Sequence, residues 1–525
     1  MPPSVIRWTH RILAAALAIS GVALAGWTFV APSRAANPIR APLNAASCFG
    51  VAAILLLLLS SRPGDPLPAE AGIAPARRHL LPITALFILI ACLFWNLAGS
   101  FFLSDDFILI HYSRTYFHEF LRQFVTAGGD GGFRPVTNVS FALTSGWAGF
   151  SPLRWHFISL AIHALNAALL YLLALRLGWT TLAAWTAAAL FAGHGITPEA
   201  VVWITARFDL LATFFVLASM FCFVSSWQGE GHVWLWRAAS LATMTLGMLS
   251  KESAYVLPML LTLWVLLVED GKHRFRALLP FWICAACVFM YRWMLFGGIG
   301  GYRDAAGGEA VYTITSFTAM KVLVWRLWSI LFFPINWSTG PGWALGLGSI
   351  LFLAVLFYLT RQRPARSLLA FTLGWVVICA MPPLHLLLIG PDLTKSRYLY
   401  LPLAGFCLLL GALAGQLGGR IRWAAVLVLC CFSWAATRHD LGAWRHASER
   451  AQASCYAAAR CANDPGRIQI TDLPRKLNGV WFFNNGFSEC VAMQHESGAI
   501  PAPEAENASC LYEWDTVRDE LRPKP

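Results

Sequence analysis

The chain has 525 residues, of which 58% are hydrophobic and only 13% are charged. Soluble globular domains carry about 25% charged residues, so this composition excludes an ordinary soluble domain. The formal charge of +12 lies mostly in short loops between apolar segments, where the positive-inside rule places it. No basic stretch is interleaved with exposed aromatic residues as a nucleic-acid groove requires, and we therefore expect no nucleic-acid partner.

Apolar runs long enough to cross a bilayer recur along most of the chain. A hydrocarbon core about 30 Å thick needs roughly 20 apolar residues per helix. The first run is long for a cleaved signal sequence, so we expect a retained helix. The predicted fold is an all-α polytopic membrane protein with about thirteen transmembrane helices, near residues 12–31, 45–60, 80–103, 154–175, 180–195, 208–227, 234–250, 254–268, 277–296, 343–360, 367–389, 399–417 and 421–437.

The basic loop residues predict the orientation of these spans. In the thirteen-span arrangement they fall on one side, which should be the cytoplasm: Arg62, Arg77, Arg78, Lys272, Arg274, Arg276, Arg361, Arg363, Arg366, Arg420 and Arg422. Segment 317–335 is apolar, but counting it as a crossing would break this pattern, and it contains Lys321 and Arg326. We predict a re-entrant or interfacial helix there, a cytoplasmic N-terminus and a periplasmic C-terminus in a bacterial inner membrane.

Two domains follow from this topology: a transmembrane domain, 1–440, and a small external tail, 441–525. The tail contains an even number of cysteines, which in a short exported segment indicates disulfides in an oxidising compartment. Their pairing does not follow from the sequence. The four candidates are Cys455, Cys461, Cys490 and Cys510.

Two adjacent carboxylates, Asp105 and Asp106, open a large external loop after the third span. Desolvating carboxylates at a membrane boundary costs free energy, so carboxylates at such a position indicate a functional site. One of them could remove the proton of an acceptor hydroxyl as that hydroxyl attacks an anomeric carbon. Alternatively, Ser104 or Asp105 caps an interfacial helix, which does not exclude catalysis by its neighbour.

Further polar residues gather in later external turns. If the residues after Pro198 are helical, Glu199, Trp203 and Arg207 share one helix face, where Glu199 could serve the site or merely pair with Arg207. Cations in these turns could hold a phosphate head or simply anchor helix ends. The candidate phosphate ligands are Arg207, Lys251 and Arg397, and the candidate pocket residues are Arg134, His163, Asn166, Asp209, Glu252 and Tyr398. For His163 and Asn166, hydrogen bonding between helices is an equal alternative.

Six short motifs follow one another over about residues 80 to 420: Asp105-Asp106, Phe133-Arg134-Pro135-Val136-Thr137-Asn138, the span with His163 and Asn166, Pro198-Glu199 with Trp203, Arg207 and Asp209, Ser250-Lys251-Glu252, and Arg397-Tyr398-Leu399-Tyr400-Leu401-Pro402. In this order and spacing the chain resembles the GT-C superfamily of membrane glycosyltransferases. It is most similar to the protein O-mannosyltransferase-like branch, which includes the tetratricopeptide-bearing transmembrane O-mannosyltransferases and their bacterial relatives.

The resemblance implies an inverting transfer of a sugar from a polyprenyl-phosphate donor, with Asp105 or Asp106 as the base. Glu199 is the next candidate carboxylate. Residues 438–525 contain no 34-residue helical repeat, so the acceptor could be a protein, a lipid headgroup or a glycan. The sequence assigns no cofactor, and it leaves open whether the reaction uses a divalent metal ion.

Two other functions compete with this one. A transporter or flippase of lipid-linked sugars would also need a polar cavity in a helix bundle, but such folds often show inverted repeats and broken helices near the midplane. The sequence indicates neither, and its charges lie at one membrane face. A non-catalytic envelope assembly protein would instead use the external tail to bind a partner.

Overall fold

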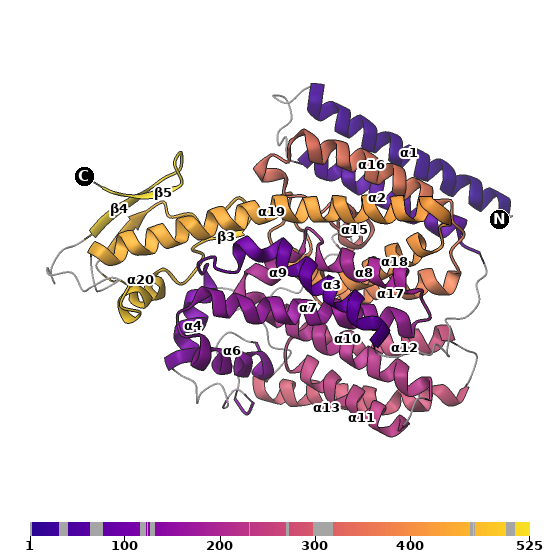
Figure 1. The fold of residues 1–525 in the computed structure, drawn as a ribbon, viewed down its shortest axis with the longest axis horizontal. Helices are drawn as coiled ribbons and strands as arrows, with labels where there is room; N and C mark the ends of the chain where they lie inside the picture. Colours follow the sequence, from indigo (N-terminus) through magenta and orange to yellow (C-terminus); the bar gives the residue numbers. More distant parts are fainter. Residues whose placement is uncertain are drawn as a thin grey trace.

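The structure of the protein is a computed structural model that describes residues 3–30, 40–62, 77–115, 122, 124–126, 132–229, 232–268, 272–297, 319–461, 466, 468–499 and 510–524. Most of these residues form helices, many of which run beside one another along the long axis of the molecule (Figure 1). The N-terminal end of α1 and strands β4 and β5 lie toward opposite ends of that axis.

The helices of the bundle are α1 (Pro3–Val30), α2 (Arg40–Ser60), α3 (Arg77–Phe94), α7 (Pro152–Arg176), α8 (Thr181–Ala192), α10 (Arg207–Trp227), α11 (Val233–Met248), α12 (Leu257–Val268), α13 (Leu279–Phe296), α16 (Gly342–Thr360), α17 (Arg366–Ala380), α18 (Tyr400–Gly415) and α19 (Gly419–Cys461). Among the described residues, eight helical segments are long and apolar enough to cross a membrane, accompanied by four shorter apolar helices. This finding confirms the prediction of an all-α integral membrane protein, but not the predicted count of about thirteen transmembrane helices.

Each of the thirteen predicted spans overlaps one of these helices, but several helices are shorter than the predicted runs. Helix α8 has 12 residues, fewer than the roughly 20 needed for a straight crossing. Helix α3 ends at Phe94 and α17 ends at Ala380, well before residues 103 and 389. The apolar runs therefore continue beyond these two helices, into segments where Phe102, Leu103 and Ile389 are buried but Trp95 and Met381 are exposed.

Short helices connect the bundle. They are α4 (Asp105–Thr115), α6 (Pro135–Ala148), α9 (Thr197–Val202) and α15 (Leu327–Phe332), with single turns η1 (Trp95–Leu97), η2 (Ile204–Ala206), η3 (Glu252–Val256), η4 (Lys272–Ala277), η5 (Lys321–Arg326), η6 (Trp337–Thr339), η7 (Leu384–Leu386) and η8 (Ser396–Leu399). The described helical stretch 319–332 includes η5 and α15. It packs against α2, where the sequence predicts a segment that does not cross.

Helix α19 continues well past the predicted end of the last span and leaves the bundle toward the C-terminal strands (Figure 1). The predicted domain boundary between 440 and 441 therefore falls inside one helix. The physical reason is that Trp444, Ala447, Ala451 and Cys455 recur at helical spacing and are all buried. One packed face thus continues from the bundle into the tail.

The rest of the described tail forms a small folded unit around the end of α19, which we call the C-terminal unit (residues 466, 468–499 and 510–524). Strand β4 (Cys510–Asp515) pairs in parallel with β1 (Ile468–Thr471) and antiparallel with β5 (Glu520–Pro523). Strands β2 (Lys476–Leu477) and β3 (Val480–Trp481) form a hairpin, and α20 (Phe487–Glu496) follows. Disulfides Cys455–Cys490 and Cys461–Cys510 join α19 to α20 and β4.

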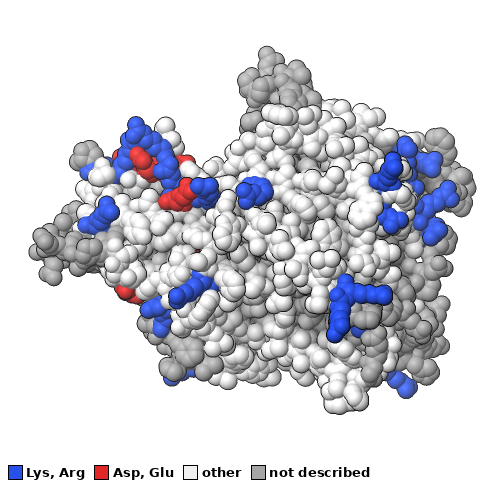
Figure 2. Space-filling view, viewed as in Figure 1, with Lys and Arg blue, Asp and Glu red and all other residues white. Residues whose placement is uncertain are grey.

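Charged residues on the visible face gather toward the two ends of the long axis, and a broad surface without charged residues separates them (Figure 2). Lys and Arg without visible Asp or Glu lie at the end that holds the start of α1. At the end with the C-terminal unit, Asp and Glu accompany the basic residues. A belt without charged residues between two charged ends is the surface that a bilayer requires.

Candidate functional site

Helix α4 begins at Asp105, so both carboxylates lie in its first turn, where the helix dipole favours negative charge. Their surroundings differ. Asp106 is 1% exposed and accepts hydrogen bonds from Thr205 N and Oγ1 at 2.8 and 2.7 Å and from Leu103 N at 3.3 Å. Burial raises the pKa of Asp106 to about 7, although these donors oppose the rise. Asp105 is only half-buried.

Two donors approach Asp105, and both reach the same oxygen. Asn485 Nδ2 of the C-terminal unit lies 2.8 Å from Asp105 Oδ1, and Ser104 Oγ lies 3.4 Å from it. Within the described residues, Oδ2 accepts no hydrogen bond. The two neighbouring carboxylates therefore differ in kind: Asp106 fastens α4 to the turn at residue 205, and Asp105 keeps one oxygen available.

Glu199, Trp203 and Arg207 do not share one helix, which corrects the sequence prediction. Helix α9 ends at Val202, Trp203 is extended, and a new helix begins at Arg207. The backbone turns here because Trp203 donates its indole N–H to Leu103 O at 3.3 Å and Asp106 holds Thr205. The partner of Glu199 is consequently not Arg207.

Glu199 is 3% exposed and pairs with Arg397, whose Nη1 lies 2.6 Å from Glu199 Oε1. Its other donors are Lys395 N, Ser396 Oγ and Arg397 N, at 3.1, 3.1 and 3.0 Å. A buried carboxylate with four donors satisfies its hydrogen-bonding capacity. Glu199 thereby fixes the turn 395–397 in place. Because donors already occupy both of its oxygens, it is poorly placed to take the proton of an acceptor hydroxyl.

Arg397 links this pair to a second one. Its guanidinium stacks on Trp203 and Tyr398 with 4.5 Å to each ring centroid, and Nε lies 3.9 Å from Asp209 Oδ2. Asp209 Oδ1 in turn accepts from Lys251 Nζ at 2.5 Å. Burial lowers the pKa of Lys251 to about 8, against the opposing charge of Asp209, so the amine remains mostly protonated at neutral pH.

A third set of charges adjoins Lys251. Glu252 accepts from Arg134 Nη2 and from Arg292 Nη1, each at 2.9 Å. Arg134 precedes α6, and its segment is held by Val136 N donating to Leu249 O at 3.1 Å. Arg292, which lies in the predicted span 277–296, is not among the site residues predicted from the sequence. An arginine within an apolar span is itself a signal of function.

The remaining predicted residues lie deeper. Arg207 is fully buried and donates to Thr144 Oγ1 at 2.9 Å and Trp155 O at 3.4 Å. His163 and Asn166 reach Tyr400 Oη at 2.6 and 3.3 Å, and their other bonds go to backbone oxygens of neighbouring helices. The contacts of His163 and Asn166 are therefore those of hydrogen bonding between helices, one of the two alternatives that the sequence leaves.

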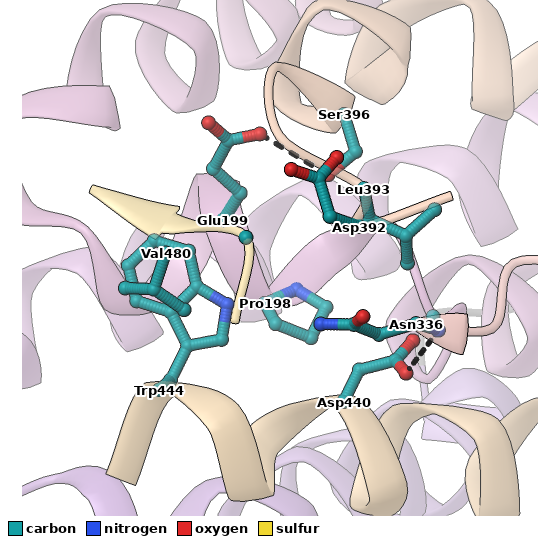
Figure 3. Close-up of a pocket in the computed structure, with 11 residues that line it drawn as sticks. Pro198, Glu199, Asn336, Asp392, Leu393, Ser396, Asp440, Trp444 and Val480 are labelled. Carbon is teal, nitrogen blue, oxygen red and sulfur yellow. Dashed lines mark hydrogen bonds between the residues drawn. The ribbon is translucent and has the colours of Figure 1, made fainter. Parts of the chain in front are cut away.

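A small polar cavity lies between Glu199 and the C-terminal unit (Figure 3). On one side Ser396 donates to Glu199, and on the other Asn336 N donates to Asp440 Oδ1 at 2.7 Å. Asp440 Oδ2 is buried without a hydrogen-bond partner among the described residues. No sequence pattern marked Asp440 or Asn336 as a site residue, because the two are 104 residues apart and come into contact only in the tertiary fold.

These contacts bring together three carboxylates and four cations from distant parts of the chain: Glu199, Asp209 and Glu252 with Arg134, Lys251, Arg292 and Arg397. We call this set the charged cluster. It adjoins Asp106 and α4 through Trp203 and Thr205. Such an arrangement can bind an anionic group and offers a carboxylate beside it. In the described parts of the chain, no group of three or more His, Cys, Asp or Glu side chains is placed to hold a metal ion.

No protein-family model matches the chain. The chain is similar to the protein O-mannosyl-transferase F38B6.6 of Caenorhabditis elegans, with 26% identity over 409 residues, which cover 70% of this chain and 56% of the worm protein. It is also similar to Tmtc2 of Drosophila melanogaster, 26% identical over 46% of this chain and 27% of that protein, and to human TMTC2, 28% identical over 27% and 17%. The matched residues thus span about half the length of the worm relative and less of the other two. The chain is therefore similar to a set of curated protein O-mannosyl-transferases.

Proposed function

We propose that this protein is a glycosyltransferase that moves a sugar, mannose by analogy with its named relatives, from a polyprenyl-phosphate donor to a hydroxyl of a protein. The observation that carries the proposal is that the charged cluster adjoins Asp106, the sequence neighbour of Asp105, through Trp203 and Thr205. The similarity to proteins named protein O-mannosyl-transferases supports the same reaction. The apolar bundle would hold the lipid tail of the donor.

We assign the role of base to Asp105. A general base must lie within hydrogen-bond reach of the proton that it removes, and geometry takes precedence over pKa. Both oxygens of Asp106 already accept hydrogen bonds, and the side chain is buried. Asp105 is half-buried and keeps Oδ2 available to an acceptor hydroxyl. Asp106 would act on the reaction indirectly, by holding α4 at its start.

We assign the donor phosphate to the cations of the charged cluster. The four cations outnumber the three carboxylates, so an anionic phosphate would be attracted. Arginine suits this task because its planar guanidinium donates two parallel hydrogen bonds to phosphate oxygens. Arg207 is fully buried away from this cluster, and we assign it to the support of α10 against α6 and α7.

In the proposed reaction Asp105 takes the proton of the acceptor hydroxyl as the hydroxyl oxygen attacks the anomeric carbon. The bond from this carbon to the phosphate oxygen breaks, and its electron pair leaves on the phosphate. Attack opposite the leaving group inverts the anomeric configuration. The phosphate needs no general acid, because Lys251 and Arg397 offset its charge.

We further propose that the end with the charged cluster and the C-terminal unit faces the periplasm of a bacterial cell, with the N-terminus in the cytoplasm. The two disulfides support this orientation, because disulfides persist in oxidising compartments. In this proposal residues 1–440 form the catalytic membrane domain and residues 441–525 an external unit joined to it by α19.

The test is a reconstituted assay with polyprenyl-phosphate mannose and a peptide rich in Ser and Thr. Replacing Asp105 by Asn should lower kcat by about 10²- to 10⁴-fold, the usual contribution of general-base catalysis, while donor binding persists. Replacing Arg134 by Gln should raise KM for the donor, because a phosphate contact is lost before reaction. Arg154→Gln, which changes an exposed arginine at the start of α7, is the control. Near-normal turnover of Asp105→Asn would refute the assigned base.

A further inference from the structure

We infer that the C-terminal unit completes the active site, with Asn485 as a positioning residue for Asp105. This inference rests on the proposed function, because it assigns Asn485 to the proposed base. Asn485 lies 380 residues from Asp105 in sequence, and its Nδ2 donates to Asp105 Oδ1 at 2.8 Å. The amide holds one carboxylate oxygen and leaves Oδ2 for the acceptor hydroxyl.

The segment that carries Asn485 is docked on α4 on both sides of this residue. Before it, Phe482 O accepts from Ser104 N at 2.9 Å, and the rings of Phe483 and Phe107 stack with centroids 5.8 Å apart. After it, Gly486 adopts φ +85° directly against Ser104 O, where an added Cβ would lie only 2.5 Å from that oxygen. Only glycine fits this approach without strain. Asn485 is therefore placed by its neighbours, independently of its own hydrogen bond.

The C-terminal unit is also fastened at two further points. In the hairpin turn between β2 and β3, Asn478 O accepts from Asn336 Nδ2 and Gly479 O accepts from Thr394 Oγ1, each at 2.8 Å. Beyond the segment, Cys490 is joined to Cys455 of α19. A unit that merely trailed from the membrane domain would need neither attachment. These attachments hold Asn485 at Asp105 in the resting protein.

The chemistry favours an amide at this position. A neutral donor orients a carboxylate without neutralising it, so the carboxylate stays able to take a proton. Without this bond the carboxylate can turn away from the acceptor hydroxyl, and a misplacement of about 1 Å can cost up to about 10²-fold in rate, so a loss of about ten-fold is expected. An aspartate at residue 485 would have nearly the same shape but would repel Asp105.

The experiment uses the full chain in the reconstituted mannosyl-transfer assay. We expect Asn485→Ala to lower kcat about ten-fold with an unchanged KM for polyprenyl-phosphate mannose. Asn485→Asp should lower kcat at least as much, although its shape is conserved. The matched control is Asn484→Ala, which changes the adjacent asparagine. If residue 485 only packs, Asn485→Asp should retain normal turnover, and that result would overturn the inference.

A double-mutant cycle tests whether Asn485 acts through Asp105. In the Asp105→Asn background, Asn485→Ala should cause no further loss, because the group that it positions is gone. An equal loss in both backgrounds contradicts the inference. A strong loss in Asp105→Asn combined with normal Asn485 variants overturns this inference alone, whereas normal turnover in Asp105→Asn overturns the proposed function itself.

Discussion

The charged residues of the cluster are constrained by burial as much as by chemistry. Glu199 and Arg397 are 3% and 14% exposed at their side chains and lie 2.6 Å apart. Removing one partner of a buried pair leaves an uncompensated charge and typically costs about 3–5 kcal/mol. Variants at Arg397 can thus lose activity by unfolding. Phosphate binding is better probed at Arg134, because its partner Glu252 is 31% exposed and keeps a second partner in Arg292.

Asp106 predicts a pH dependence of stability. Burial raises its pKa to about 7, whereas the carboxyl of an unfolded chain titrates near 4. Between these values the folded protein keeps a proton that the unfolded chain has lost, so the free energy of unfolding falls as pH rises from about 4 to about 7 and levels off above that. Each pKa unit corresponds to about 1.4 kcal/mol, which makes the effect a few kcal/mol.

Asp106→Asn should abolish this decline. We expect the melting temperature of the wild type in detergent to fall relative to that of Asp106→Asn as pH rises from 4 to 7. The control is Glu449→Gln, which removes an exposed carboxyl of the surface pair with Arg445. A constant difference between wild type and Asp106→Asn over this range would show that the buried carboxyl does not titrate there.

At the scale of elements, α19 couples the membrane bundle to the C-terminal unit. It is one helix of 43 residues, and both disulfides join its last turns to segments far along the chain. Because α19 is one continuous helix, it fixes the position of the C-terminal unit relative to the bundle and to the charged cluster. The segment with Asn485 can reach α4 for this reason.

The disulfide Cys455–Cys490 should protect the C-terminal unit from proteolysis. A cross-link of this kind typically contributes about 2–4 kcal/mol, so its loss should open the unit more often and expose the bonds after Arg475 and Lys476, both exposed residues. We expect the double variant Cys455→Ser/Cys490→Ser to be cut by trypsin about ten-fold faster or more.

The control for this prediction is Cys431→Ser, which changes an exposed free cysteine of α19. Treatment of the wild type with a reductant should reproduce the faster cleavage. Equal cleavage rates before and after reduction would mean that the disulfide does not hold the C-terminal unit closed.

For the whole molecule, the distribution of charge predicts its orientation in the membrane. Lys and Arg without visible acidic partners gather at the end that holds the start of α1 (Figure 2), and basic loops stay in the cytoplasm. A reporter fused after residue 499 should be active only if it functions outside the cytoplasm. A reporter fused after Arg62 should show the opposite behaviour, and cytoplasmic activity of the first fusion would invalidate the proposed topology.

The sequence by itself determined that this protein lies in a membrane and where along the chain its helices fall, to within several residues. Apolar runs must lie in lipid and must satisfy their backbone groups internally, so a chain with 13% charged residues predicts a helical membrane protein. The adjacent Asp105 and Asp106 and the polar turns were visible because polar residues stand out between apolar runs. The four tail cysteines were visible as a disulfide set for the same reason.

Only the tertiary structure decided which of these residues meet. Helical spacing suggested that Glu199 lies over Arg207, but Trp203 interrupts the helix and Glu199 contacts Arg397, 198 residues away. Two adjacent aspartates look alike in sequence, yet Thr205 and Leu103 bury one while Asn485 contacts the other. Asn485 carries no local pattern that links it to the site, and the position of Arg292 within an apolar span does not identify its partner Glu252. Periodicity reports which face of an element is apolar, whereas partners far along the chain are fixed by packing, which a local pattern does not contain.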